Sequence, residues 1–114
     1  MPFEFGDVLL LPFPFSSHSA VKKRPAIVVS SRAYNNAKPD VVVMAVTSQL
    51  RPTPELGEVW IGQWQKAGLL KPSAVKPVFA TIEQLLVIRQ LGSLDITDQL
   101  ALLHTIGQII GEPN

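Results

Sequence analysis

The sequence contains no cysteine, and its two histidines, His18 and His104, lie far apart along the chain. Without cysteine there can be no disulfide, no thiolate metal site and no cysteine nucleophile. Neither histidine has a partner at a spacing typical of metal ligands, which argues against a catalytic zinc site. Charged residues are also sparse, at 17%, whereas hydrophobic residues make up 46%. This balance excludes an intrinsically disordered chain.

Long apolar runs and a targeting signal are also missing. Val8–Phe15 is one of the longest apolar runs, and it is far shorter than the roughly 20 residues that a membrane-spanning helix needs. The N-terminus shows neither a basic residue before its apolar stretch nor a small-residue cleavage site. We therefore expect a soluble, cytoplasmic protein with no membrane partner. Its 114 residues suit a single domain over residues 1–114.

Basic residues and prolines are concentrated in the first two thirds of the chain. Residues 1–80 hold nine basic and five acidic residues (9 − 5 = +4), whereas residues 81–114 hold one basic and four acidic residues (1 − 4 = −3). A basic body is compatible with a polyanionic ligand. Nine of the ten prolines lie in residues 1–77. Since proline disfavours helix interiors and central strands, we expect short strands and loops there.

The pattern of β-branched runs between turn residues predicts a mainly β member of the α+β class. The six expected strands are Asp7–Leu11, Ala26–Ser30, Val41–Val46, Gly57–Ile61, Ala74–Ala80 and Val87–Leu91. Their close spacing predicts a small antiparallel barrel. Between the second and third strands, Ser31–Ala37 predicts one helical turn capped by Ser30 or Ser31.

The end of the chain predicts an α-helix. An apolar stripe recurs at helical spacing and consists of Ile96, Leu100, Leu103, Ile106 and Ile110. Asp95 is the expected N-cap, and Asp98 suits the first turn because the helix dipole favours negative charge there. Gly111 and Pro113 mark the end. We expect the stripe to pack on the barrel, with His104 at its polar border.

The first candidate site is the basic cluster Lys22-Lys23-Arg24, which directly precedes Pro25 and ends the polar loop that begins at Ser16. A guanidinium fixed beside a proline can take two phosphate oxygens at once. The alternative is a solvated turn whose lysines serve solubility. His18 lies in the same loop and suits proton transfer near neutral pH, although it could equally be an exposed loop histidine without a role.

The second candidate site is Thr47-Ser48-Gln49, which follows the apolar strand Val41–Val46. Hydroxyls at the rim of a sheet can hold a phosphate or a developing charge. The alternative is a simple turn, in which threonine and serine are common. Trp60 and Trp64 could stack bases, but core or interface packing is favoured for at least one of them.

An ordered set of motifs resembles one family. Gly6-Asp7-Val8 opens the first strand and is followed by Phe13-Pro14-Phe15, Lys23-Arg24-Pro25-Ala26, Val46-Thr47-Ser48-Gln49, Trp64, Gly68-Leu69, Pro72-Ser73 and Val75. In order and spacing this set is similar to the MazF/PemK family of toxin–antitoxin endoribonucleases. The resemblance runs from Gly6 to the C-terminal helix.

The resemblance implies an SH3-like barrel that forms a homodimer and cuts single-stranded RNA without a metal or cofactor. Attack by the 2′-hydroxyl would leave a 2′,3′-cyclic phosphate and a 5′-hydroxyl, and a cognate antitoxin would block the active surface. The catalytic arginine corresponds to Arg24 and the catalytic threonine or serine to Thr47, with Ser48 next in register. The expected substrate-binding residues around them are Lys22, Lys23, His18, Ser48 and Gln49. The sequence assigns no general base. His18 and Asp7 stay open as candidates, and so does a reaction that depends on alignment of the substrate.

Two other functions remain open from the sequence. One is a non-enzymatic toxin, similar in fold to CcdB, that binds DNA gyrase. The other is an inactive relative that only binds nucleic acid or a partner. The pairing of Arg24-Pro25 with Thr47 favours the ribonuclease. The RNA sequence that is cut does not transfer from any relative, because the loop from Ser16 to Lys23 is short.

Overall fold

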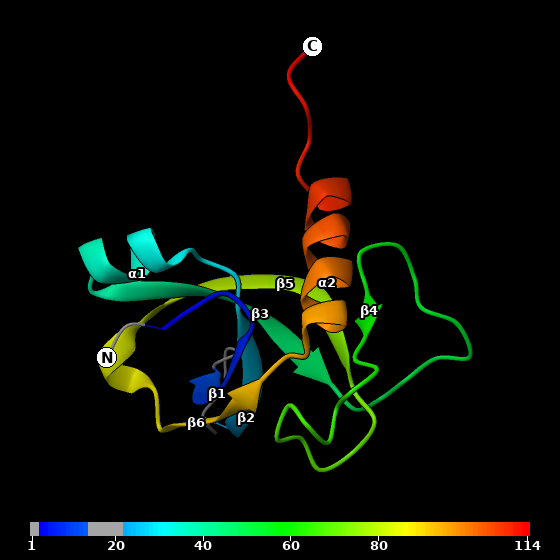
Figure 1. The fold of residues 1–114 in the computed structure, drawn as a ribbon, viewed down its shortest axis with the longest axis horizontal. Coiled ribbons are helices and arrows are strands. Elements are labelled where there is room, and N and C mark those ends of the chain that lie inside the picture. The colour runs from blue at the N-terminus through cyan, green and yellow to red at the C-terminus, as the bar shows by residue number, and fades with distance from the viewer. Residues whose placement is uncertain (1–2, 14–21) are drawn as a thin grey trace.

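A six-stranded antiparallel sheet with the strand order β4-β5-β3-β2-β1-β6 forms the body of the molecule. The computed structural model describes residues 3–13 and 22–114. The strands are β1 (Asp7–Phe13), β2 (Lys22–Val28), β3 (Asp40–Thr47), β4 (Val59–Trp60), β5 (Ala74–Glu83) and β6 (Arg89–Ser93). The sheet curls into a half-open barrel, and the helix α2 (Ile96–Ile109) stands beside it (Figure 1). The expected mainly β barrel with a C-terminal helix is confirmed.

Both faces of the sheet carry buried side chains at its centre. Val8, Ile27 and Met44 belong to one hydrophobic cluster together with Leu102 of α2. Their chain neighbours, such as Leu9, belong to a second cluster on the opposite face. Since successive side chains of a strand point to opposite faces, a strand buried on both sides is apolar throughout. This double burial explains why β3 shows no alternation of polar and apolar residues.

Two short helical segments follow β2 and β5. The helix α1 (Arg32–Ala37) is capped by Ser31, whose side chain accepts a hydrogen bond from the backbone N–H of Tyr34 at 3.1 Å. Ser30, the other candidate cap, instead accepts a hydrogen bond from the N–H of Val42 at 3.0 Å and so fastens the start of α1 to β3. A 3₁₀ turn, η1 (Gln84–Leu86), follows β5.

The helix α2 begins as expected but packs through a different face. The Asp95 side chain accepts from the N–H of Thr97 at 3.1 Å, and a hydrogen bond from Lys66 lowers the pKa of Asp95 below its usual value. The buried residues of α2 are Asp98, Leu102 and Thr105. Most of the predicted stripe is exposed, with Ile96, Leu100, Leu103 and Ile110 between 57% and 63% accessible. Ile106 is the stripe residue that packs against the described core, together with Ile109 from outside the stripe.

The prediction that the whole stripe packs on the barrel is therefore wrong. The buried carboxylate of Asp98 accepts hydrogen bonds from the backbone N–H groups of Gly62 and Gln63, both at 2.9 Å. Because this anchor needs Asp98 to face the body of the molecule, the helix turns Leu102 inward and Leu103 outward. Hydrophobic periodicity identified the helix, but a polar contact selected the face that is buried.

The outer strands also differ from the predicted bounds. The expected strand Gly57–Ile61 is reduced to Val59–Trp60, and β5 extends to Glu83. No helix among the described residues is long and apolar enough to cross a membrane.

Candidate active site

The second predicted polar cluster lies where β3 ends. Val46 is buried, Thr47 is half-buried, and Ser48 and Gln49 are exposed. The backbone N–H of Gln49 donates to Oγ1 of Thr47 at 3.1 Å. A hydroxyl has one proton and two lone pairs, so this bond uses one lone pair and leaves the proton of Thr47 available for an acceptor. The turn thus orients the hydroxyl as a donor at the rim of the sheet.

The first predicted cluster lies in a strand rather than at the end of a loop. Lys22, Lys23 and Arg24 belong to β2, where they pair with Phe13, Pro12 and Leu11 of β1. The prediction that this strand begins at Ala26 is therefore wrong. Pairing with β1 is a backbone interaction that extends β2 through residues whose side chains give no strand signal. As a result, a strand and not a loop fixes the direction of Arg24.

Two prolines, Pro25 and Pro77, lie where the backbone pairing on each side of β3 is interrupted near its end, which leaves an opening in the sheet. Pro25 has no N–H to donate, and β2 pairs with β3 only over Ala26–Val28. On the other side of β3, Met44 pairs with Phe79 and Val46 with Val75, so that residues 76–78 of β5 lie opposite Ala45 alone. Pro77 is at the centre of this irregularity. Such bulges redirect side chains, and here the bulge brings Lys76 to the opening.

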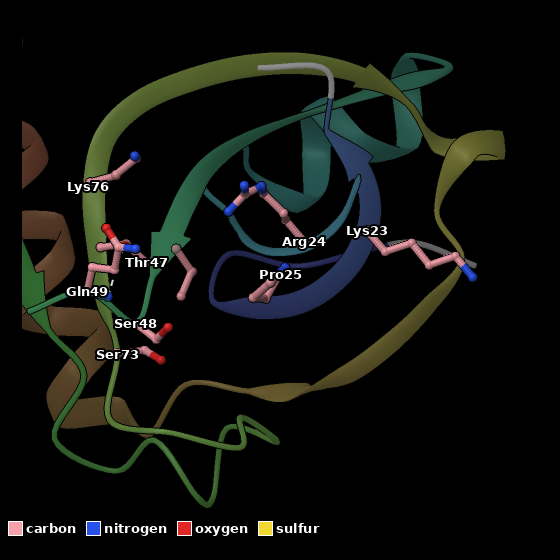
Figure 2. Close-up of a pocket in the computed structure, with 9 residues that line it drawn as sticks. Lys23, Arg24, Pro25, Thr47, Ser48, Gln49, Ser73 and Lys76 are labelled. Atoms are coloured by element: carbon pink, nitrogen blue, oxygen red, sulfur yellow. Dashed lines mark hydrogen bonds between the residues drawn. The ribbon is translucent and has the colours of Figure 1, made fainter. Parts of the chain in front are cut away.

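The opening is a pocket of about 410 Å³ that joins the two predicted clusters. Its lining consists of Lys23, Arg24, Pro25, Val46, Thr47, Ser48, Gln49, Ser73 and Lys76. Figure 2 shows the Arg24 side chain directed into the space between the strands, with Lys76 above Thr47. The side chain of Lys23 extends away from it, as expected for the neighbour of Arg24 on a strand.

The chemistry of this lining suits a phosphate. The described lining residues bring the cationic side chains of Arg24 and Lys76 to the opening and include no carboxylate, while Lys23 lines it with its charged end directed away. Thr47 and Ser48 add hydroxyl donors opposite the guanidinium. A guanidinium and hydroxyl groups around one space can neutralise and orient the oxygens of a phosphodiester.

Sequence reasoning missed the contribution of β5, from which Lys76 reaches the pocket. Thr47 pairs with Ala74, so the register places Ser73 beside Ser48. Ser73 is buried, and its hydroxyl donates to the carbonyl of Lys71 at 2.8 Å. It therefore shapes the turn into β5 and has no proton left for a phosphate. Ser73 belongs to the Pro72-Ser73 motif, but only the β3–β5 register, which the sequence does not specify, would have pointed to Lys76.

Several other candidates lie elsewhere. Lys22 is exposed on β2 and does not line the pocket, and His18 is outside the described residues. Asp7 accepts from the N–H of Glu4 at 2.9 Å and from the hydroxyl of Ser93 at 3.2 Å, away from the lining. Trp64 packs against the core, whereas Trp60 is 41% exposed on β4.

Groups of metal-ligating side chains are not found in the part of the chain that the structure describes. Over residues 3–13 and 22–114, no three His, Asp or Glu side chains lie close enough together to hold a metal ion. His104 is exposed on α2, apart from the pocket.

Comparison with known families gives one match over nearly the whole chain. The sequence model of the family described as PemK-like, MazF-like toxin of type II toxin–antitoxin system matches residues 4–110. A comparison with curated protein sequences finds no significant match.

Solved structures share the fold at low sequence identity. The Mycobacterium tuberculosis toxin MazF-mt6 is 23% identical with a TM-score of 0.72, over 90% of this chain and 93% of that one. An endoribonuclease in complex with its cognate antitoxin from Mycobacterial species is 18% identical, with a TM-score of 0.77 over 97% of each chain. MazE-MazF (Form-III) from Deinococcus radiodurans is also 18% identical, with a TM-score of 0.77 over 99% of this chain and 100% of that one.

Proposed function

Because the chain belongs to the family of PemK-like, MazF-like toxins of type II toxin–antitoxin systems, we propose that it is an endoribonuclease that cuts single-stranded RNA at specific sequences. The observation that carries the proposal is the convergence of Arg24 and Lys76 with Thr47 and Ser48 around one carboxylate-free pocket among the described residues. Solved structures of the same fold are named as endoribonucleases.

The proposed reaction is an attack by the 2′-hydroxyl on the adjacent phosphorus. The 2′-oxygen forms a bond to phosphorus while the bond to the 5′-oxygen breaks, which gives a 2′,3′-cyclic phosphate and a 5′-hydroxyl. The proton of the 2′-hydroxyl passes to a base, and the departing 5′-oxygen takes up a proton. Negative charge grows on the phosphoryl oxygens, where the permanently charged Arg24 stabilises it. Thr47 donates its free proton to the same oxygens and fixes their orientation.

We propose that the reaction needs no metal ion. The cations of Arg24 and Lys76 lie where a metal would otherwise neutralise the phosphate, and the described lining offers no carboxylate to hold one. Lys23, Ser48 and Gln49 are the proposed substrate contacts at the rim. Lys22 and His18 remain predictions for the neighbouring part of the RNA path.

The test is cleavage of single-stranded RNA by the purified protein in EDTA, followed by analysis of the product ends. We expect cleavage in EDTA with cyclic phosphate ends. Cleavage that is lost in EDTA and restored by magnesium or manganese would overturn metal independence, and a free 3′-hydroxyl would exclude this mechanism. RNA that stays intact under all conditions, as with a gyrase-binding toxin or an inactive relative, would overturn the enzymatic proposal.

We also propose two protein partners, a second copy of the chain and a cognate antitoxin. The exposed aliphatic stripe of α2, which includes Leu100 and Leu103, supports self-association because large apolar surfaces are typical of interfaces. One solved structure of this fold is an endoribonuclease in complex with its cognate antitoxin. We expect the antitoxin to compete with RNA for the groove beside Lys22–Arg24. An antitoxin that binds without lowering RNA affinity would contradict this competition.

A further inference from the structure

A second pocket lies directly beside the candidate active site. Its volume is about 570 Å³, and it shares Pro25, Ser48 and Ser73 with the first pocket. The three shared residues form a common wall. A ligand group held against Arg24 and Thr47 is therefore adjacent to whatever occupies the second pocket.

A β-bulge and a close backbone contact build this second pocket. Val8 pairs with Gly92 and Leu9 with Gln90, so Leu91 is an extra residue of β6 and lines the pocket. The backbone of Gly68 lies against Leu91, and a Cβ atom at Gly68 would approach the Leu91 carbonyl oxygen to 2.1 Å. Gly68 also has a φ of 84°, which favours glycine. The approach of the two segments thus requires a glycine at this point.

The loop that carries Gly68 is fastened at a second point. The Asp98 carboxylate holds the N–H groups of Gly62 and Gln63, and Lys66 forms an ion pair with Asp95 at 2.9 Å. Within the loop, the N–H of Leu69 donates to the carbonyl of Trp64 at 3.0 Å. Because α2 holds one end and β6 the other, the pocket wall is formed before any ligand arrives.

The lining combines apolar walls with cations at the rim. The apolar walls come from Leu10, Leu69, Leu70 and Leu91. Lys71 and Arg89 are exposed at the edge, and the described lining contains no acidic residue. Among the described residues, neither cation takes part in an ion pair. Apolar walls beside cations that form no ion pair with the described residues are complementary to a nucleotide, because a nucleotide joins a flat base to an anionic phosphate.

We propose that this second pocket holds the nucleobase next to the scissile phosphate and so contributes to the choice of the cleavage sequence. Leu70 and Leu91 contact the base, while Arg89 and Lys71 bind the phosphate that follows it. The proposal rests on the proposed ribonuclease function, since it places the scissile phosphate in the first pocket. RNA is favoured over a peptide because the shared wall connects the pocket to the phosphate site.

The test uses two exposed positions whose substitution leaves the core intact. Leu70→Ser is matched by Leu85→Ser, because these leucines are 93% and 92% exposed and Leu85 lies on η1 outside both pockets. Arg89→Gln is matched by Arg32→Gln on α1. Each protein is assayed on a pool of single-stranded RNA with a randomised centre, and the cut sites are sequenced. Binding is measured on the same RNA with a 2′-deoxy sugar at the cut.

We expect Leu70→Ser to flatten the base preference at one position next to the cut and to lower kcat/KM by roughly 5- to 10-fold through KM, with kcat retained. Arg89→Gln should weaken RNA binding. It should also reduce the slope of a plot of log K against the logarithm of salt concentration by about 0.7, because one phosphate contact on a single strand contributes that amount. Both control variants should match the wild type.

Other outcomes separate this proposal from the function on which it rests. If the wild type cuts RNA but all four variants cut the same sites equally well, the base pocket is overturned and the ribonuclease stands. If the wild type cuts no RNA, the proposed ribonuclease function is wrong. If all variants then also bind RNA equally well, the proposed base-binding role of the second pocket is wrong too. If Leu70→Ser and Arg89→Gln weaken only antitoxin binding, the pocket belongs to the antitoxin and the proposal is wrong.

Discussion

Arg24 is the residue on which the proposed chemistry depends most, because it is a permanent cation directed into the pocket. Its half-buried side chain lies at the rim of the sheet, apart from both core clusters. Substitution should therefore affect the reaction much more than the fold.

We expect Arg24→Ala to lower kcat by about 10²- to 10³-fold, as for loss of a single transition-state donor. Thr47→Ala should also lower kcat, and Thr47→Ser should restore most of it because the hydroxyl is kept. Single-turnover cleavage in EDTA measures both effects. The control is Arg32→Ala, an exposed arginine paired with Glu4, and melting temperatures check the fold. An Arg24→Ala protein of native activity would remove Arg24 from the site, whereas damage by Ser48→Ala alone would move the hydroxyl role to Ser48.

Gly68 has the tightest surroundings of the seven glycines. A methyl group there meets the Leu91 carbonyl at 2.1 Å, and φ is 84°. We expect Gly68→Ala to lower the free energy of unfolding by about 2–4 kcal/mol, since strain and a forced displacement add together. Gly111→Ala is the control because nothing lies within 4 Å of its added Cβ, and it should change stability by less than about 0.5 kcal/mol. Urea titration of both variants measures the difference, and equal midpoints would contradict the contact.

The helix α2 forms where its hydrophobic periodicity predicts, but it buries a different face from the predicted one. Leu102 is fully buried, whereas Leu103, one residue further, is 57% exposed. We expect Leu102→Ala to lower the free energy of unfolding by about 2–5 kcal/mol at any protein concentration, because it leaves a cavity in the core.

Leu103→Ala is the matched comparison on the same helix. Its effect should appear only at protein concentrations where the proposed dimer forms, since association adds to apparent stability by mass action. Chemical unfolding at two protein concentrations separates the two cases. A large, concentration-independent loss for Leu103→Ala, with a small one for Leu102→Ala, would restore the orientation predicted from periodicity.

At the scale of the whole molecule, the helix α2 carries an aliphatic stripe that the described residues leave largely exposed. The stripe comprises Ile96, Leu100, Leu103 and Ile110. Aromatic side chains contribute less to the exposed apolar surface: Phe3, Phe5 and Trp64 pack against the core clusters, and Trp60 and Phe79 are about two-fifths exposed. Small symmetric proteins most often close such surfaces as two-fold dimers.

We expect the wild type to sediment as a homodimer and the double variant Leu100→Glu/Leu103→Glu to sediment as a monomer with unchanged helix content. Each copy would bring two carboxylates to the interface, and burying these four negative charges together is strongly unfavourable. Leu85→Glu, at an exposed leucine on η1, is the control and should remain dimeric. A monomeric wild type at micromolar concentration would contradict the proposal.

The sequence by itself determined the local features of this protein. Asp95 was identified as the cap of α2, and the cap of α1 was narrowed to Ser30 or Ser31, because a side-chain oxygen within reach of the next N–H groups is a local property. The runs around Val8, Ile27 and Val43 became central strands because β-branched and apolar residues favour them. The two polar clusters, near Arg24 and Thr47, were also visible as interruptions between apolar runs.

The tertiary structure alone decided what these features contact. The β1–β2 pairing extended β2 back to Lys22, and the β3–β5 register brought Lys76 and Ser73 to Thr47. The anchor of Asp98 on the loop at residues 62–63 selected the buried face of α2, and the Gly68–Leu91 approach built the second pocket. Each of these contacts joins residues that are not neighbours along the chain. Local propensity carries no information about them, because their free energy depends on the register and burial that exist only once the chain has folded.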